Sequence, residues 1–231
     1  MRKTAFLLKA FSAVVMAVAL HTAQAAIVAG KDYAVLHTPQ PVETGDKIEV
    51  LEAFSYMCPH CYQFEPKLSA WTKTQPADVT VRKLPITFNR ADWAHLAQLY
   101  YSLDAMGEVS KLHGKVFDAI HAQKVDLPNL DVMSDWIEKQ GIDKKKFLDT
   151  YNSFSVQAKT KQVPQLTANY EVQSVPSIIV DGKYKVIGAT SLDDMFRITN
   201  ELIALARSQR PAKVASPSAS PAPAKQVSTK K

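Results

Sequence analysis

The chain has 231 residues, 46% of them apolar, so it is long enough to bury a sizeable core. Its net charge of +6 comes from the two ends: eight Lys and Arg residues and no acidic residue lie in residues 1–25 and 210–231, which leaves −2 for the region between them. A mildly acidic body with basic ends argues against a nucleic-acid-binding protein.

The first 25 residues have the three parts of a secretory signal peptide. Arg2 and Lys3 give a positive start, residues 10–20 are apolar, and Ala23-Gln24-Ala25 forms a small-x-small cleavage site. The apolar run is well short of the ~20 residues that span a bilayer, which argues against the alternative of a membrane anchor. We expect cleavage after Ala25 and export to a compartment where disulfides can persist.

Residues 26–88 combine strand patterns with one helix. The proline-containing segment 26–46 has room for a short edge strand but not for a dimerisation domain. A helix is expected to start near Cys58 and to reach about Lys73, with Pro59 in its first turn and a kink at Pro66. Alternating apolar and β-branched residues predict three strands, over residues 33–36, 47–54 and 79–86.

After residue 88 the apolar residues recur at helical spacing, and period-two alternation returns near residue 177. Pro164 is expected to interrupt one of these helices. A turn at Asp181-Gly182 predicts a hairpin. The predicted helices cover residues 96–106, 109–121, 131–140, 143–151, 154–170 and 192–208, and the hairpin strands cover residues 177–180 and 183–187.

This order predicts an α/β fold. Parallel strands 47–54 and 79–86, joined by the antiparallel hairpin, give a mixed central sheet flanked by helices, with an inserted all-helical subdomain. The end of the chain is rich in Pro, Ala, Ser and Lys and is expected to be disordered. The predicted parts are a signal peptide (1–25), the first part of the sheet domain with the cysteine helix (26–88), the helical subdomain (89–168), the second part of the sheet domain (169–208) and the tail (209–231).

The only two cysteines stand in the motif Cys58-Pro59-His60-Cys61, for which four roles compete. Haem attachment needs a histidine after the second cysteine, where this chain has Tyr62. A structural disulfide over so short a loop stabilises little. A dithiol–disulfide catalyst fits a motif that follows a strand and opens a helix. A zinc site needs two further ligands, drawn from carboxylates or from His60, His95, His113 and His121.

The catalyst hypothesis gives the two cysteines different roles. Cys58 precedes the helix, where unpaired backbone N–H groups stabilise a thiolate, so we expect it to be exposed and to be the nucleophile. Cys61 lies one turn further on and is expected to be shielded and to release the mixed disulfide. His60 adds hydrogen-bond donors and, when protonated, positive charge beside the thiolate. Pro59-His60 is therefore expected to make the disulfide oxidising, unless His60 is only a solvated loop residue.

Residues 50–65, with the sequence VLEAFSYMCPHCYQFE, closely resemble the active-site segment of the DsbA family of bacterial periplasmic thiol–disulfide oxidases. The resemblance extends over about residues 33–208 and implies a thioredoxin fold split by a helical insertion, with a proline loop before the final hairpin. Ala53 and Met57 stand where many relatives have phenylalanine, and the tail after Arg210 is not a standard family feature.

The same resemblance implies roles for five further residues. Glu52 matches a buried acid under the active site and is expected to transfer protons, although it could instead be a solvent-facing strand residue. Glu65 and Lys83 match a nearby charged pair, with a surface salt bridge as the alternative. The Val175-Pro176 bond matches the family's cis-proline loop, whose backbone pairs with an extended substrate peptide.

The sequence thus predicts a monomeric periplasmic oxidase that needs no cofactor beyond its own redox-active disulfide. It would pass the Cys58–Cys61 disulfide to reduced, unfolded exported proteins through a mixed disulfide. The resemblance implies reoxidation by a membrane partner of the DsbB kind. Two alternatives remain: a disulfide isomerase or reductase, and a peptide-binding chaperone in which the cysteines have no catalytic role.

Overall fold

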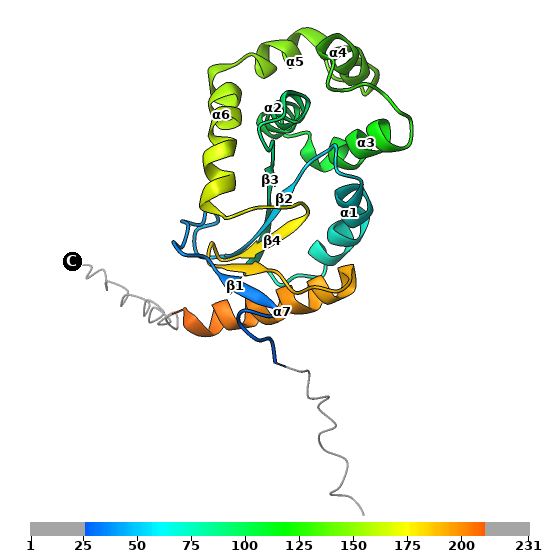
Figure 1. The fold of residues 1–231 in the computed structure, drawn as a ribbon. Helices are drawn as coiled ribbons and strands as arrows, with labels where there is room; N and C mark the ends of the chain where they lie inside the picture. Colours follow the sequence, from blue (N-terminus) through cyan, green and yellow to red (C-terminus); the bar gives the residue numbers. More distant parts are fainter. Residues whose placement is uncertain (1–25, 211–231) are drawn as a thin grey trace, which may run out of the picture.

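The computed structural model describes residues 26–210, so the predicted signal peptide and residues 211–231 of the predicted tail lie outside the described residues. The described part forms an α/β fold with a mixed sheet, as predicted, and its helices lie around the sheet and over one end of it (Figure 1). None of its helices is both long and apolar enough to cross a membrane.

The central sheet has five strands in the order β1-β5-β4-β2-β3. Strand β2 is parallel to β3 and antiparallel to β4, as predicted. All seven residues of β2 are buried, as is typical of a strand that is covered on both faces. The strands are β1 (Tyr33–Val35), β2 (Ile48–Phe54), β3 (Val79–Pro85), β4 (Ser177–Val180) and β5 (Tyr184–Val186).

Successive residues of β2 point to opposite faces of the sheet. Val50 packs with apolar side chains of α1 (Pro59–Thr72) and α7 (Leu192–Gln209). Leu51 packs on the other face of the sheet, with Tyr170 and Val172. Because Glu52 is two residues after Val50, its carboxylate points to the same side as α1.

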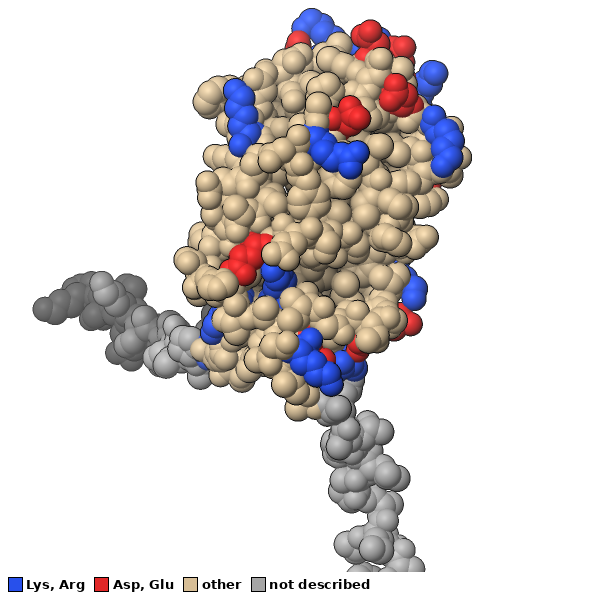
Figure 2. Space-filling model, viewed as in Figure 1, with Lys and Arg blue, Asp and Glu red and all other residues tan. Residues whose placement is uncertain are grey.

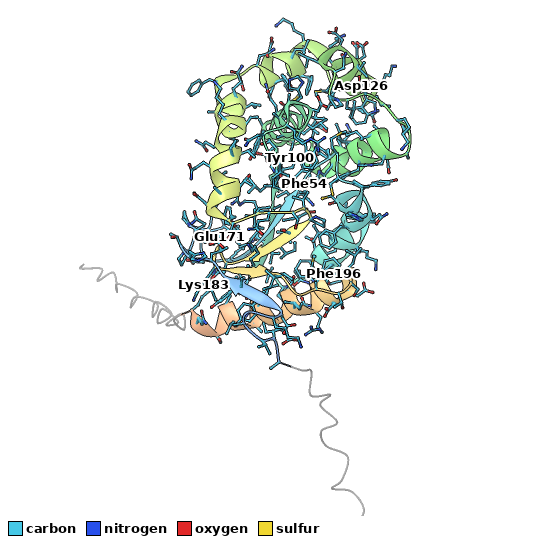
Figure 3. The ribbon with its side chains drawn as sticks, viewed as in Figure 1. Phe54, Tyr100, Asp126, Glu171, Lys183 and Phe196 are labelled. Carbon is cyan, nitrogen blue, oxygen red and sulfur yellow. The ribbon has the colours of Figure 1, made fainter. Side chains whose placement is uncertain are left out.

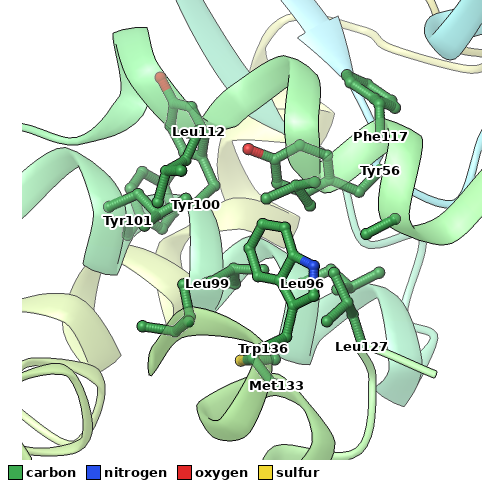
Figure 4. Close-up of a cluster of buried hydrophobic side chains, with 14 of the residues drawn as sticks. Tyr56, Leu96, Leu99, Tyr100, Tyr101, Leu112, Phe117, Leu127, Met133 and Trp136 are labelled. Carbon is green, nitrogen blue, oxygen red and sulfur yellow. The ribbon is translucent and has the colours of Figure 1, made fainter. Parts of the chain in front are cut away.

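Five helices form a block between β3 and β4 and lie over one end of the sheet (Figure 1). Their apolar side chains form one cluster with Tyr56 (Figure 4). Cys58 also belongs to this cluster. Phe54 and Tyr100 meet at the junction of the block and the sheet, with ring centroids 5.3 Å apart (Figure 3). The block consists of α2 (Ala91–Ala105), α3 (Val109–His121), α4 (Leu130–Lys139), α5 (Lys144–Tyr151) and α6 (Phe154–Asn169).

Three details of the predicted helices are wrong. Helix α2 begins at Ala91 and not at residue 96. Helix α6 runs without interruption through Pro164. Its Val156 and Val163 are buried in the helical block, and this packing outweighs the one hydrogen bond that the proline removes. Helix α7 continues to Gln209, and the Arg210 side chain binds the Asp181 carboxylate, so the part of the chain predicted to be disordered from residue 209 is ordered through residue 210.

Candidate active site

The Cys58 side chain caps the N-terminus of α1. Its sulfur accepts a hydrogen bond from the backbone N–H of Cys61 at 3.4 Å, and Pro59 occupies the first turn of the helix, where an N–H is not needed. Both cysteines are free thiols in this structure. The sulfur of Cys58 therefore lies where the unpaired N–H groups and the dipole of α1 favour negative charge.

The two sulfur atoms have opposite pKa shifts. The pKa of Cys58 is lowered from 9.0 to about 6, mainly because the Cys61 thiol donates a hydrogen bond to its sulfur. Partial burial raises this pKa, but the backbone N–H groups of Cys61 and His60 lower it further. Burial raises the pKa of Cys61 far above its ordinary value. At neutral pH the reduced site therefore holds a thiolate at Cys58 and a thiol at Cys61.

The structure corrects the expected exposure of the nucleophile. Cys58 is only 7% exposed, against 0% for Cys61. Its sulfur is covered by the loop before β4 and lies 3.4 Å from the carbonyl oxygen of Val175, to which only the protonated thiol form of Cys58 can donate a hydrogen bond. The Val175–Pro176 peptide bond is cis, as expected. The exposed residues of the motif are Pro59 and His60, and His60 lowers the pKa of Cys58 through its backbone N–H and then through its charge.

Glu52, Lys83 and Glu65 form a largely buried charged group, and the charge of Glu52 adds to the effect of burial in raising the pKa of Cys61. Glu52 is fully buried, so the solvent-facing alternative is wrong. The Lys83 ammonium lies 2.5 Å from Glu52 and 2.7 Å from Glu65, and both partners of the expected Glu65–Lys83 pair are largely buried. Burial alone would lower the pKa of Lys83, but the two carboxylates raise it above its ordinary value.

Two residues of this site, Tyr56 and His113, were not predicted as site residues. The Tyr56 hydroxyl lies 2.7 Å from Nδ1 of His113, and His113 Nε2 lies 3.2 Å from Glu65. The sequence proposed His113 only as a possible zinc ligand. Its position on the same helical face as Val116 and Phe117, both buried, is the signal that could have revealed a buried histidine.

One set of potential metal ligands is present among residues 26–210: one donor atom each of Glu52, Glu65 and His113 lies within 4.8 Å of the others. Neither cysteine belongs to this set. The Lys83 ammonium already lies between the two carboxylates and balances part of their charge. The donor set therefore does not support the zinc alternative, which needed the two cysteine sulfurs as ligands.

Comparisons with known proteins agree with this geometry. Residues 49–198 match the family model described as the DSBA-like thioredoxin domain. The chain is 43% identical over 162 residues to the thiol:disulfide interchange protein DsbA of Burkholderia cepacia, covering 70% of this chain and 76% of the relative. It is 41% identical over 157 residues to the protein of the same name from Pseudomonas aeruginosa, covering 68% and 74%.

Solved structures of this family have the same fold. The crystal structure of Pseudomonas aeruginosa DsbA matches with a TM-score of 0.74 and 38% identity, over 79% of this chain and 95% of that chain. The oxidoreductase DsbA from Xylella fastidiosa matches with a TM-score of 0.74 and 30% identity, over 79% and 98%. The chain is a thiol:disulfide oxidoreductase with a thioredoxin fold, and it belongs to the DsbA family.

Proposed function

We propose that the protein is an oxidase that transfers its Cys58–Cys61 disulfide to pairs of thiols in reduced exported proteins. The observation that carries the proposal is the difference between the two sulfur atoms, a lowered pKa at Cys58 and a raised pKa at Cys61. Each unit by which the pKa of Cys58 is lowered stabilises the reduced form by ~1.4 kcal/mol, or ~30 mV in a two-electron couple. A stabilised reduced form is what makes a disulfide oxidising.

The reaction proceeds through a mixed disulfide. A substrate thiolate attacks the sulfur of Cys58, the Cys58–Cys61 bond breaks, and Cys61 leaves with the electron pair and takes up a proton. A second substrate thiolate then attacks the substrate sulfur of the mixed disulfide, and Cys58 leaves as a thiolate. Glu52 is the proposed donor and acceptor of the Cys61 proton, because it is a buried carboxylate on the side of the sheet that faces α1.

The substrate is proposed to bind as an extended strand beside Val175. The carbonyl of Val175 is within hydrogen-bonding range of the Cys58 sulfur, so a peptide paired with this backbone would bring its own thiol to Cys58. The surface across the middle of the molecule, over β4 and the segment before it, has few charged side chains (Figure 2). The exposed or half-buried residues of this region include Gln173, Ser174, Val175, Pro176, Pro59 and His60, none of which is Asp, Glu, Lys or Arg.

The proposed location is the periplasm, after cleavage near Ala25, with the protein acting as a monomer. This rests on the signal-peptide pattern of residues 1–25 and on the family to which the chain belongs. Release of one disulfide leaves the enzyme reduced, so an oxidant must restore it. We propose a membrane partner like DsbB for this step.

Equilibration of the purified protein with oxidised and reduced glutathione tests the direction of the reaction. We expect a potential far above the value of about −270 mV that is typical of the reductase thioredoxin. A potential near thioredoxin's would refute the oxidase and favour a reductase. Cys58→Ala should lose all oxidation of a reduced dithiol peptide. In Cys61→Ala the Cys58 thiolate should attack the disulfide of the oxidised peptide and accumulate the mixed disulfide, because no second enzyme thiol can release it.

A further inference from the structure

His113 is a buried titratable side chain for which the proposed reaction has no role. It lies on α3 and is 4% exposed. Its ring is held by the Tyr56 hydroxyl at Nδ1 and by edge-on contacts with Phe54 and Phe117, whose centroids are 5.0 Å and 5.2 Å away. The orientation of the ring, and therefore of Nε2, is fixed by these contacts.

Two buried side-chain atoms in the described part of the chain lack a hydrogen-bond partner, and both belong to this region. They are Oε1 of Glu52 and Nε2 of His113. Nε2 comes within 3.2 Å of Glu65 but is not aligned for a hydrogen bond. Buried polar atoms without a partner are rare and call for an explanation. Donor atoms of Glu52, Glu65 and His113 lie within 4.8 Å of one another, a separation that one water molecule can bridge.

A cavity of about 650 Å³ opens to solvent between α1 and α3. Glu65, Lys83 and His113 line it, whereas the buried Glu52 does not. A row of contacts therefore leads from the fully buried Glu52 to the wall of this cavity. The contacts are Glu52–Lys83, Lys83–Glu65 and Glu65–His113. Further residues of the cavity wall are Lys73, Lys111 and Lys115.

We propose that His113 is a positioning residue that connects Cys61 with solvent in the α1–α3 cavity, so that protons enter and leave on this side and not through the face that binds substrate. The inference rests on the proposed function. A proton that Glu52 gives to the Cys61 thiolate is replaced from His113 through a water that bridges their donor atoms, while Lys83 stays protonated between Glu52 and Glu65. His113 takes the last proton from cavity water, and no electron moves along this path.

The surroundings of His113 suit such a relay. The groups that face it are Glu52 from β2, Glu65 from α1, Lys83 from β3, Tyr100 from α2 and the Tyr56 hydroxyl. Burial lowers its pKa below the ordinary value, so the ring is neutral at pH 7 and returns to the neutral form after each transfer.

The test uses the full-length oxidised protein and the variants His113→Gln and His113→Ala. Reduction by dithiothreitol is followed by stopped flow through the absorbance of the Cys58 thiolate, in water and in deuterium oxide. We expect His113→Gln to be about tenfold slower and to acquire a solvent isotope effect, because proton supply to Cys61 then limits the rate. Imidazole should enter the enlarged cavity of His113→Ala and restore the rate. His95→Gln, which alters an exposed histidine of α2, is the matched control.

Wild-type rates and isotope effects in a folded His113→Gln variant would overturn the inference. A slow His113→Ala variant that imidazole does not accelerate would do the same, since it would mean that the ring only fills space. The proposed function is tested separately, by the potential of the wild-type protein. A wild-type protein that is not oxidising refutes the oxidase, whatever the behaviour of the His113 variants.

Discussion

Cys58 is charged in the folded, reduced protein at a pH where an unfolded cysteine is not. Its pKa is about 6 in the folded state and 9.0 as the ordinary value. Between these values the unfolded state binds more protons, so the free energy of unfolding of the reduced protein increases with pH from about 6 to about 9, and this contribution is lost as the pH falls through 6. We expect a slope of up to ~1.4 kcal/mol per pH unit.

Urea unfolding of the reduced protein at several pH values in this window measures the slope. Cys58→Ser and the oxidised protein form no thiolate at this position. In both, the free energy of unfolding should lack the part of the pH dependence that comes from Cys58 and should keep the part that comes from all other groups. Parallel pH profiles for the reduced wild type and Cys58→Ser would contradict the lowered pKa of Cys58.

Lys83 is the cation that the two buried carboxylates share, at 2.5 Å from Glu52 and 2.7 Å from Glu65. Lys83→Met keeps an apolar stem of similar length but leaves both carboxylates without this partner. Removal of one partner of a buried ion pair typically costs ~3–5 kcal/mol, and we expect a loss of at least ~3 kcal/mol in denaturant unfolding at pH 7. The control is Lys67→Met, which breaks an exposed pair with Asp193 and should cost less than ~1 kcal/mol. Equal losses would show that the buried pair is no stronger than a surface pair.

Individual site residues could be predicted only in part. The sequence around the two cysteines resembles a known family. That resemblance indicated that Glu52, Glu65 and Lys83 belong to the site. The burial of Cys58 was missed because the carbonyl that covers it belongs to Val175, 117 residues away. His113 was missed as a site residue because its contacts with Tyr56 and Glu65 arise from the packing of α3 against α1, which no local pattern records.

At the scale of elements, α6 shows where a local rule fails. Pro164 is exposed in the middle of a continuous helix, while its neighbour Val163 is fully buried. The sequence predicted the existence and type of every strand and helix from periodicity. The expected interruption was wrong because tertiary packing, which periodicity does not quantify, holds the helix across the proline.

Pro164→Ala should therefore stabilise the protein. The change restores a backbone N–H to the helix and removes the clash of the ring with the preceding turn, effects of up to ~3 kcal/mol. The unfolded chain also gains freedom, which offsets about 1 kcal/mol. We expect a net gain of ~1–2 kcal/mol in denaturant unfolding and a smaller gain for Pro164→Gly, because glycine is a poor helix former. No gain in Pro164→Ala would mean that α6 has already adapted to the proline.

At the scale of the whole molecule, the helical block and the sheet share their core at the active site. The cluster that holds the block together includes Phe54 from β2, Tyr56 and both cysteines. The sequence predicted the block as an inserted helical subdomain over residues 89–168. The structure shows that its apolar side chains are continuous with the end of β2 and the start of α1, so we expect the two parts to unfold together.

Phe54→Ala tests this expectation. Phe54 is fully buried and its ring contacts Tyr56, Tyr100 and Phe117, so its truncation should cost ~3–5 kcal/mol. If the block and the sheet unfold as one unit, amide hydrogen exchange measured segment by segment should show the same loss of protection in α2–α6 as in β2–β4. The control is Phe154→Ser, since Phe154 is 88% exposed and should change stability by less than ~0.5 kcal/mol. Loss of protection in β2–β4 alone would mean that the inserted block folds independently of the sheet.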